Sequence, residues 1–511
     1  MSDNSSNNKR IAKNTMFMYI RMIVIMLVSL FTVRIVFNAL GEDNYGIYNV
    51  VGTIIVLFGF INNGLTTATR RYITAEIAQG DEASQQNVFN LSLCAHALIG
   101  AIILILAETV GLYLVNYTLN IPDDRLFAAN VVYQMSILSA LWGVFQAPYT
   151  AAITAYERMN IYAYLSIIEV ILKLVVAYSV LVYSGDKLIC YSILIFAVSF
   201  INTLLTRLYC IRKFVICRFK KPHNLSLLKE MFGFMGWSLV GQFVVVLTSQ
   251  GVSMLVNVFF TVAANAAMGI SNQITSIVNN FVTNFQVAFQ PQITKQYVTE
   301  DYDSLNTLAL RASRFSSYLV LIFMIPICFQ IRNFLSIWLG DYPEYAVEFS
   351  ILTLICVFID AISAPLWMIV FADKSIKKYQ IIMAAIYSFN FIGAWCALKI
   401  GLPPYSVIIA RIVVYSVALV ARILLVKDKV QSFSILEWCK DCLFNSAIII
   451  SIPLLLMILL TKVSIGNMYA ELIIMSGVGV VMMAVSIYTL GLKKEEREFV
   501  NTKIRQVVRS R

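Results

Sequence analysis

The chain consists of one apolar stretch after another, each about 20 residues long and followed by a short polar turn. An α-helix rises 1.5 Å per residue, so about 20 residues cross a hydrocarbon core of about 30 Å. Only helices and closed barrels span a membrane, and continuous apolar runs lack the alternating pattern of a barrel strand. We therefore predict an all-α polytopic membrane protein. The fourteen expected spans are 14–37, 46–69, 88–112, 126–150, 161–183, 188–206, 235–258, 266–290, 315–336, 347–371, 379–398, 405–426, 443–461 and 469–490.

Positive charge is distributed unevenly between the two sets of loops. Thirty of the 39 Lys and Arg residues fall in segments on the side of the N-terminus, and four (Arg125, Lys187, Lys399, Lys462) fall in the opposite loops. Because cytoplasmic loops are enriched in Lys and Arg, both termini are expected in the cytoplasm. The net charge of +11 then faces anionic membrane lipids, so no nucleic-acid partner is expected.

A basic segment after the sixth span divides the first twelve spans into two sets of six. Each set contains a span, a short outer loop and a second span rich in polar residues, with Gly46 and Gly269 at equivalent places. Internal repeats of this kind are typical of transporters. The predicted parts are an N-lobe at 1–206, a linker at 207–234, a C-lobe at 235–426, two further spans within 427–490 and a basic tail at 491–511.

Cysteine and histidine usage gives no sign of a metal or a disulfide framework. All nine cysteines lie in spans or on the inner side. Cys439 and Cys442 form a CxxC pair, but a zinc site needs two further ligands and the chain has only two histidines. No Walker motif or glycine-rich phosphate loop occurs, so neither a cofactor nor an enzymatic activity is expected.

Five basic residues fall inside the predicted spans, namely Arg21, Arg34, Lys173, Arg332 and Arg411. An Arg or Lys at a span centre costs about 2.5 to 3.5 kcal/mol, so these side chains are expected to face a wet interior or a partner. Arg34 and Arg332 are close enough to a boundary to reach it instead. We predict Arg21, Arg34, Lys173 and Arg411 as a cationic substrate-binding group.

The acidic residues inside the spans have two alternative roles. Glu169 and Lys173 are four residues apart on one helix face, in the order that favours an ion pair. This pair either neutralises itself or takes part in function. Asp360 either pairs with Arg411 across helices or binds a coupling cation. Proton or sodium entry through Glu169 or Asp360 is therefore a hypothesis.

The excess of cations inside the spans predicts an anionic cargo, because a guanidinium group donates two parallel hydrogen bonds to phosphate or carboxylate. Polar residues on the second and eighth spans add groups that can replace the hydration of a hydroxyl-rich molecule. The alternative is that they join helices to one another. The predicted polar lining residues are Asn62, Asn63, Asn272 and Gln273.

With these features in place, the chain resembles the polysaccharide transporter family, the Wzx-like O-antigen and exopolysaccharide flippases of the MOP (MATE-like) superfamily. The resemblance is carried by the basic N-terminus, by RIVFNALGEDNYGIYNVVG at 34–52 and by TRRYITAEIAQGD at 69–81. It implies two six-helix lobes plus two C-terminal helices, and a central cationic cavity. It also implies alternating-access transfer of a polyprenyl-pyrophosphate-linked oligosaccharide, such as an O-antigen or capsule unit, across the bacterial cytoplasmic (inner) membrane. A polysaccharide polymerase is a candidate partner in such a system.

Three other functions compete with this interpretation. A MATE-type multidrug exporter is expected to have twelve spans and an acidic cavity. A lipid II flippase shares the span count and the pyrophosphate cargo. A membrane-embedded polymerase or ligase is expected to carry a large outer loop with catalytic residues, whereas the longest outer loop here, at about 113–125, has one Arg and no His.

Overall fold

The computed structural model describes residues 2–79, 81–156, 158–221, 246–287, 299–372, 377–460, 466–498 and 501–502, with isolated residues between 229 and 297. Side chains are described from Arg21 onward, with gaps between 57 and 79. By their contacts, the residues form two compact units, Met1–Gly269 and Ile270–Arg511.

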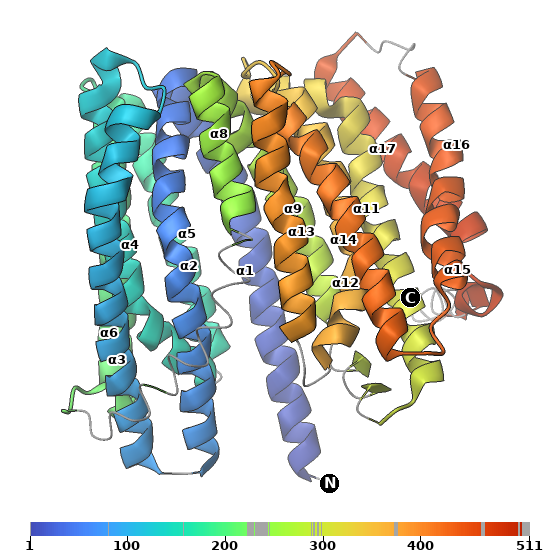
Figure 1. The fold of residues 1–511 in the computed structure, drawn as a ribbon, viewed down its shortest axis with the longest axis horizontal. Helices are drawn as coiled ribbons and strands as arrows, with labels where there is room; N and C mark the ends of the chain where they lie inside the picture. Colours follow the sequence, from blue (N-terminus) through green and yellow to red (C-terminus); the bar gives the residue numbers. More distant parts are fainter. Residues whose placement is uncertain are drawn as a thin grey trace. The chain divides into compact units, whose positions relative to one another are not determined.

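All regular secondary structure in these described ranges is helical, which confirms the predicted all-α class (Figure 1). The first unit contains α1 (Ser2–Leu40), α2 (Glu42–Gln79), α3 (Glu82–Leu106), α4 (Leu126–Ala155), α5 (Met159–Val182), α6 (Lys187–Lys213) and α8 (Val252–Phe259). Helix α9 (Val262–Val287) crosses the division, and the second unit continues with α11 (Tyr302–Leu339), α12 (Ala346–Ala372), α13 (Lys377–Lys399), α14 (Ser406–Lys429), α15 (Ile435–Trp438), α16 (Asn445–Leu460) and α17 (Met468–Ser486).

Eleven helical stretches of the described chain are long and apolar enough to cross a membrane. They are Arg21–Leu40, Glu82–Thr118, Asp123–Ala155, Met159–Val182, Lys187–Lys213, Tyr302–Leu339, Ala346–Ala372, Lys377–Lys399, Ser406–Lys429, Ile435–Leu460 and Met468–Gly491. Two of the other predicted spans, 46–69 and 266–290, lie in α2 and α9, and most of 235–258 lies outside the described residues. The chain is thus a multi-pass membrane protein.

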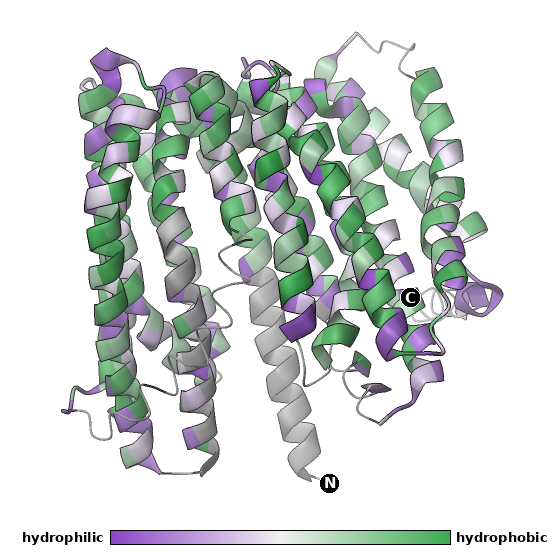
Figure 2. Ribbon diagram, in the orientation of Figure 1, coloured by the Kyte–Doolittle hydropathy of each residue, from purple (hydrophilic) through white to green (hydrophobic). Residues whose placement is uncertain are grey.

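The helices carry apolar side chains on their outward faces. On α5, Ile171, Val175, Tyr178 and Val182 are all exposed, and Val182 is 83% exposed. Their spacing of three or four residues places them on one face of the helix. Figure 2 shows hydrophobic residues along most of the described helices and hydrophilic residues mainly near their ends. An apolar face of this extent is what lipid contact requires.

Side-chain caps and glycines set several helix ends. Asp81 accepts a hydrogen bond from the amide of Ala83 at the start of α3, and Asp186 accepts from Leu188 and Ile189 at the start of α6. Such caps satisfy amides that have no partner within the helix. Gly41 separates α1 from α2 with φ of +78°, a conformation that side chains other than glycine rarely adopt.

The predicted boundary between lobes remains a prediction. Much of the expected linker, including 222–228 and 230–234, lies outside the described residues. The contacts divide the chain within α9, between Gly269 and Ile270, rather than at 207–234. Helix α8 and the preceding turn Leu247–Gly251 pack against α2, which places them with the first unit.

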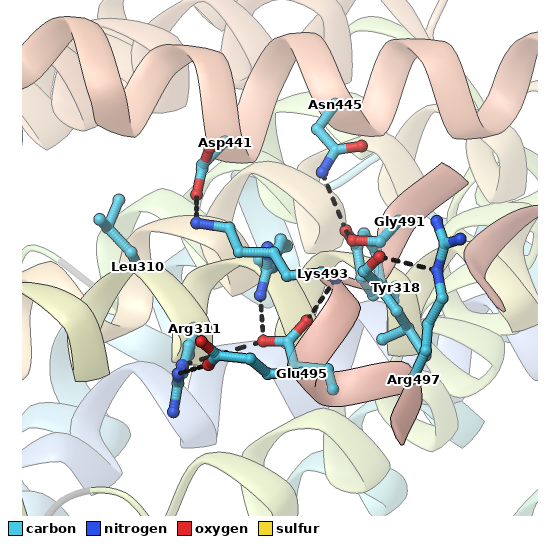
Figure 3. Close-up of polar contacts among 12 residues, drawn as sticks. Leu310, Arg311, Tyr318, Asp441, Asn445, Gly491, Lys493, Glu495 and Arg497 are labelled. Atoms are coloured by element: carbon cyan, nitrogen blue, oxygen red, sulfur yellow. Dashed lines mark hydrogen bonds and ion pairs between the residues drawn. The ribbon is translucent and has the colours of Figure 1, made fainter. Parts of the chain in front are cut away.

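The two C-terminal helices are attached to α11 by polar contacts as well as by apolar packing (Figure 3). The Tyr318 hydroxyl donates to the Gly491 carbonyl at 2.9 Å and accepts from Asn445 at 3.1 Å. Nearby, the buried Arg314 pairs with Glu496, and Lys493 Nζ lies 2.7 Å from Asp441 Oδ2. The predicted appendage at 427–490 therefore packs on the second unit near the end of α11 where that helix begins.

Candidate functional site

A cavity of about 510 Å³ lies among five helices of the first unit. It is lined by three charged side chains, Arg21 on α1 and Glu169 and Lys173 on α5. Amide and hydroxyl groups make up most of the remaining polar lining. They are Ser29, Asn62, Thr66, Gln146, Thr150, Tyr162, Ser166, Asn202 and Thr206.

The polar face of α5 explains why this cavity forms here. Tyr162, Ser166, Glu169 and Lys173 follow one another at intervals of four, three and four residues, which places them on one side of the helix. The opposite side carries the exposed apolar residues described above. An intramembrane helix with such polarity directs its charged side toward other helices because lipid contact is costly.

The predicted pair on α5 is present. Lys173 Nζ lies 2.6 Å from Glu169 Oε1, and the other carboxylate oxygen of Glu169 accepts from Asn202 Nδ2 at 2.9 Å. Both charged side chains remain partly exposed, at 41% for Lys173 and 32% for Glu169. The pair is thus accessible from the cavity and is fixed by α6 as well as by its own helix.

Arg21 lies on the neighbouring helix. Its guanidinium carbon lies 4.6 Å from the centroid of the Tyr162 ring, and Nη2 lies 3.5 Å from the Tyr162 hydroxyl. A guanidinium over an aromatic face is held by electrostatic attraction. Arg21 Nε, Asn62 Oδ1 and Asn202 Oδ1 are buried and have no hydrogen-bond partner among the described residues. The cavity thus retains unused donors and acceptors.

The charge balance of this cavity is positive. Arg21 and Lys173 contribute two positive charges and Glu169 contributes one negative charge, with no other charged residue in the lining. A fixed positive charge in a partly dehydrated site attracts an anion more strongly than it would in water. The arrangement can bind an anionic group next to a hydroxyl-rich one.

The other predicted site residues lie elsewhere. Arg34 is exposed on α1 and does not line the cavity. The side chain of Asn63 lies outside the described residues. Asn272 is exposed and Gln273 is half-buried, both on the part of α9 that belongs to the second unit. Of the four polar lining residues predicted, Asn62 is the one described in this cavity.

In the second unit, Asp360 has a different partner from the one considered. Asp360 Oδ1 lies 3.3 Å from Arg422 Nη1, so the proposed alternative of a pair with Arg411 is wrong. Arg422 also donates to Tyr379 at 3.1 Å, to Tyr387 at 2.8 Å and to Ser363. The sequence interpretation placed Arg422 on the inner side because it is close to the end of its span, whereas its side chain is only 9% exposed.

Arg411 is also buried on α14, with 9% of its surface exposed, and it interacts electrostatically with Cys356 and Tyr415. It precedes Arg422 by eleven residues, which places both on the same face of the helix. The nitrogens of Arg422 are occupied by side chains of α12 and α13, so its role in the described structure is to join three helices.

Sequence reasoning missed several cavity residues, notably Gln146, Tyr162, Asn202 and Thr206. Gln146 and Thr206 share a hydrogen bond of 3.2 Å between α4 and α6. The available signal was the position of Gln146 and Asn202 within predicted apolar spans. An amide there is expected to have a partner inside the bundle.

Comparisons with known proteins support a transporter fold. A family model described as MatE matches residues 18–179. No curated protein sequence matches the chain. Among solved structures, an inward-facing multidrug resistance MATE family transporter of the MOP superfamily aligns with a TM-score of 0.66 and 12% identity, over 80% of this chain and 96% of that one.

Two further solved structures are similar. The lipid II flippase MurJ, in an inward closed conformation, aligns with a TM-score of 0.66 and 12% identity, over 93% of this chain and 98% of its own. A MOP superfamily transporter from Pyrococcus furiosus aligns with a TM-score of 0.57 and 16% identity, over 83% of this chain and 96% of that one. The chain therefore has the MOP superfamily transporter fold.

Proposed function

We propose that this protein is a flippase that moves a polyprenyl-pyrophosphate-linked oligosaccharide from the inner to the outer leaflet of a bacterial cytoplasmic membrane by alternating access. The observation that carries the proposal is the cavity of the first unit, where Arg21 and Lys173 outnumber Glu169 among many amide and hydroxyl groups. The resemblance to the polysaccharide transporter family supports the same cargo.

The charge of the cavity favours an anionic head group. Guanidinium and ammonium groups are the usual protein partners of phosphate, and Arg can donate two parallel hydrogen bonds to it. A cavity for cationic drugs is expected to carry the opposite balance. The MATE-type exporter is therefore less well supported than a carrier of phosphate-linked cargo.

The hydrogen-bonding groups suit a sugar. Moving one unsatisfied hydroxyl into an alkane-like medium costs about 4 to 8 kcal/mol, so an oligosaccharide does not cross a bilayer unaided at a useful rate. Amides and hydroxyls such as Asn62, Gln146 and Ser166 can replace part of that hydration while the lipid tail remains in the bilayer. The sugar then crosses without contact with the hydrocarbon.

A lipid II flippase is the second candidate. One specific observation favours it: the alignment with MurJ extends over 93% of this chain, whereas that with the MATE transporter extends over 80%. Both candidates carry a pyrophosphate, so the cavity charge does not separate them. The matched proteins are described as transporters or a flippase, which leaves the polymerase or ligase as the weakest alternative.

The experiment that tests the proposal follows labelled lipid-linked oligosaccharide in cells producing wild type or Arg21→Gln at matched levels. Loss of one charged hydrogen bond to the cargo costs about 1.5 to 3 kcal/mol, so transfer is expected to fall about tenfold or more, with cargo accumulating in the inner leaflet. Arg332→Gln, which removes an exposed arginine of α11, is the matched control and is expected to transfer cargo normally.

Normal transfer in Arg21→Gln, with the protein present in the membrane, would refute the proposed role of this cavity. Accumulation of lipid II in place of the oligosaccharide would favour the second candidate. The orientation with both termini in the cytoplasm, a polymerase partner, and proton or sodium coupling through Glu169 or Asp360 remain parts of the proposal. Transport in vesicles that is indifferent to both gradients would remove the coupling.

A further inference from the structure

The cavity of the first unit already contains an anion, the carboxylate of Glu169. Its Oε1 lies 2.6 Å from Lys173 Nζ, and its Oε2 accepts from Asn202 at 2.9 Å. Asn202 is 5% exposed and comes from α6, so the carboxylate is positioned by a second helix and not only by its neighbour one turn along α5. Lys173 therefore has a built-in partner.

The ion pair is accessible. Lys173 is 41% exposed and Glu169 is 32% exposed, and both line the cavity together with Arg21. An ion pair that is partly exposed is weak because solvent competes for both groups. A ligand that brings more than one negative charge can therefore replace a single carboxylate at Lys173.

The empty cavity has the opposite requirement. A carrier that works by alternating access must close around the site when no cargo is present. An ammonium group enclosed without a partner is strongly destabilising, because its hydration is lost and nothing replaces it. Arg21 has the face of the Tyr162 ring as a partner, at 4.6 Å from its guanidinium carbon. Lys173 has Glu169.

We propose that Glu169 is a surrogate anion, which holds Lys173 while the cavity is empty and releases it to the negatively charged group of the cargo when the cavity fills. This inference rests on the proposed function. Cargo binding then exchanges one ion pair for another, and Asn202 retains Glu169 through its hydrogen bond. The empty carrier is stabilised at the expense of cargo affinity.

Charged groups from each surrounding helix enter this balance. Arg21 approaches from α1, Lys173 lies on α5 itself, and the phenol of Tyr48 on α2 interacts electrostatically with Lys173. Helices α4 and α6 contribute the neutral Gln146 and Asn202. Glu169 is the one acidic side chain in the described lining, so its removal leaves the cations without an internal competitor.

The test measures binding of inorganic pyrophosphate to the purified full chain in detergent, at one pH and one ionic strength, by calorimetry. Glu169→Gln keeps the shape of the side chain and a hydrogen bond to Asn202 but removes the charge. Its Kd is expected to fall about fivefold to tenfold relative to wild type. The matched control is Asp428→Asn, which removes a carboxylate 2.8 Å from Lys378 in the second unit and is expected to leave the Kd unchanged.

A double-mutant cycle with Lys173→Gln separates competition from general repulsion. If Glu169 competes for Lys173, the gain from Glu169→Gln falls to less than half in the Lys173→Gln background. An equal gain in both backgrounds would mean that Glu169 merely repels anions, and would overturn the inference. Unliganded melting of each variant checks folding, and Glu169→Asp, which keeps the charge but shortens its reach, is a second variant expected to bind more tightly than wild type.

The same measurement on Arg21→Gln distinguishes the two proposals. Weaker binding in Arg21→Gln together with unchanged or weaker binding in Glu169→Gln would overturn the surrogate anion and leave the proposed function standing. No binding to wild type, or binding indifferent to Arg21, would contradict both.

Discussion

At the scale of single residues, Asp186 joins three parts of the first unit. Its carboxylate caps α6 and pairs with Arg125, with Nη1 2.8 Å from Oδ2. Arg125 in turn donates from Nε to Asn44 at the start of α2 at 2.9 Å. Burial by itself would raise the pKa of Asp186, but the hydrogen bonds from Arg125 and from the amides of α6 outweigh it and hold the pKa below its usual value.

This lowered pKa predicts how stability depends on pH. The contribution of Asp186 is fully present above the pKa of an unfolded aspartate, at about 3.9, and is lost as the pH falls through the lower folded value. Asp186→Asn should therefore melt below wild type at neutral pH, and the difference should shrink in acid. Thermal unfolding in detergent across this range measures it. Asp124→Asn, at an exposed site in the same loop as Arg125, should show no such convergence.

At the scale of helices, the close approach of α2 to the start of α9 depends on a residue without a side chain. A Cβ built on Gly46 would lie 2.1 Å from the backbone carbonyl oxygen of Val262, which is closer than any non-bonded contact. Val262 is 4% exposed, so the two segments have little room to separate. Small residues are what permit membrane helices to approach this closely.

Gly46→Ala is therefore expected to destabilise the first unit. Overpacking of this kind costs about 1 to 3 kcal/mol, because a backbone segment and not a flexible side chain must move. The comparison variant is Gly52→Ala on the same helix, where a Cβ would meet nothing within 4 Å. Melting of both variants in detergent checks the prediction, and equal stability of the two would contradict it.

At the scale of the whole molecule, the protein is a series of apolar helices whose orientation in the membrane follows from the charge of its loops. The uneven distribution of Lys and Arg predicts that the end of α2 and the start of α3 face the cytoplasm, and that the loop before α4 faces the opposite side. The N-terminal charges precede the first span, so they act on the whole topology.

Cysteine labelling tests this orientation. In a background without native cysteines, Asp124→Cys, at an exposed position before α4, is expected to react with a membrane-impermeant maleimide on intact cells. Glu82→Cys, at an exposed position at the start of α3, is expected to react only after the membrane is permeabilised. The reverse pattern would overturn the predicted orientation.

Long-range partners limited what the sequence could predict about charged residues. Glu169 and Lys173 are four residues apart, so helix geometry alone predicted their pair, and the structure confirms it. Asp360 and Arg422 are 62 residues apart on different helices, and nothing local selects Arg422 over Arg411. The choice depends on which helix faces α12, and that is decided by packing.

The sequence by itself determined the class of this protein, because the length and apolarity of its stretches leave a helix as the only structure that satisfies the backbone in lipid. Tertiary structure decided which polar groups meet. The cavity joins Arg21 of α1 to Tyr162 and Lys173 of α5 and to Asn202 of α6, although more than a hundred residues separate the first two. Periodicity places a residue on a face of its own helix, but the rotation and neighbours of that helix follow from the packing of the whole bundle.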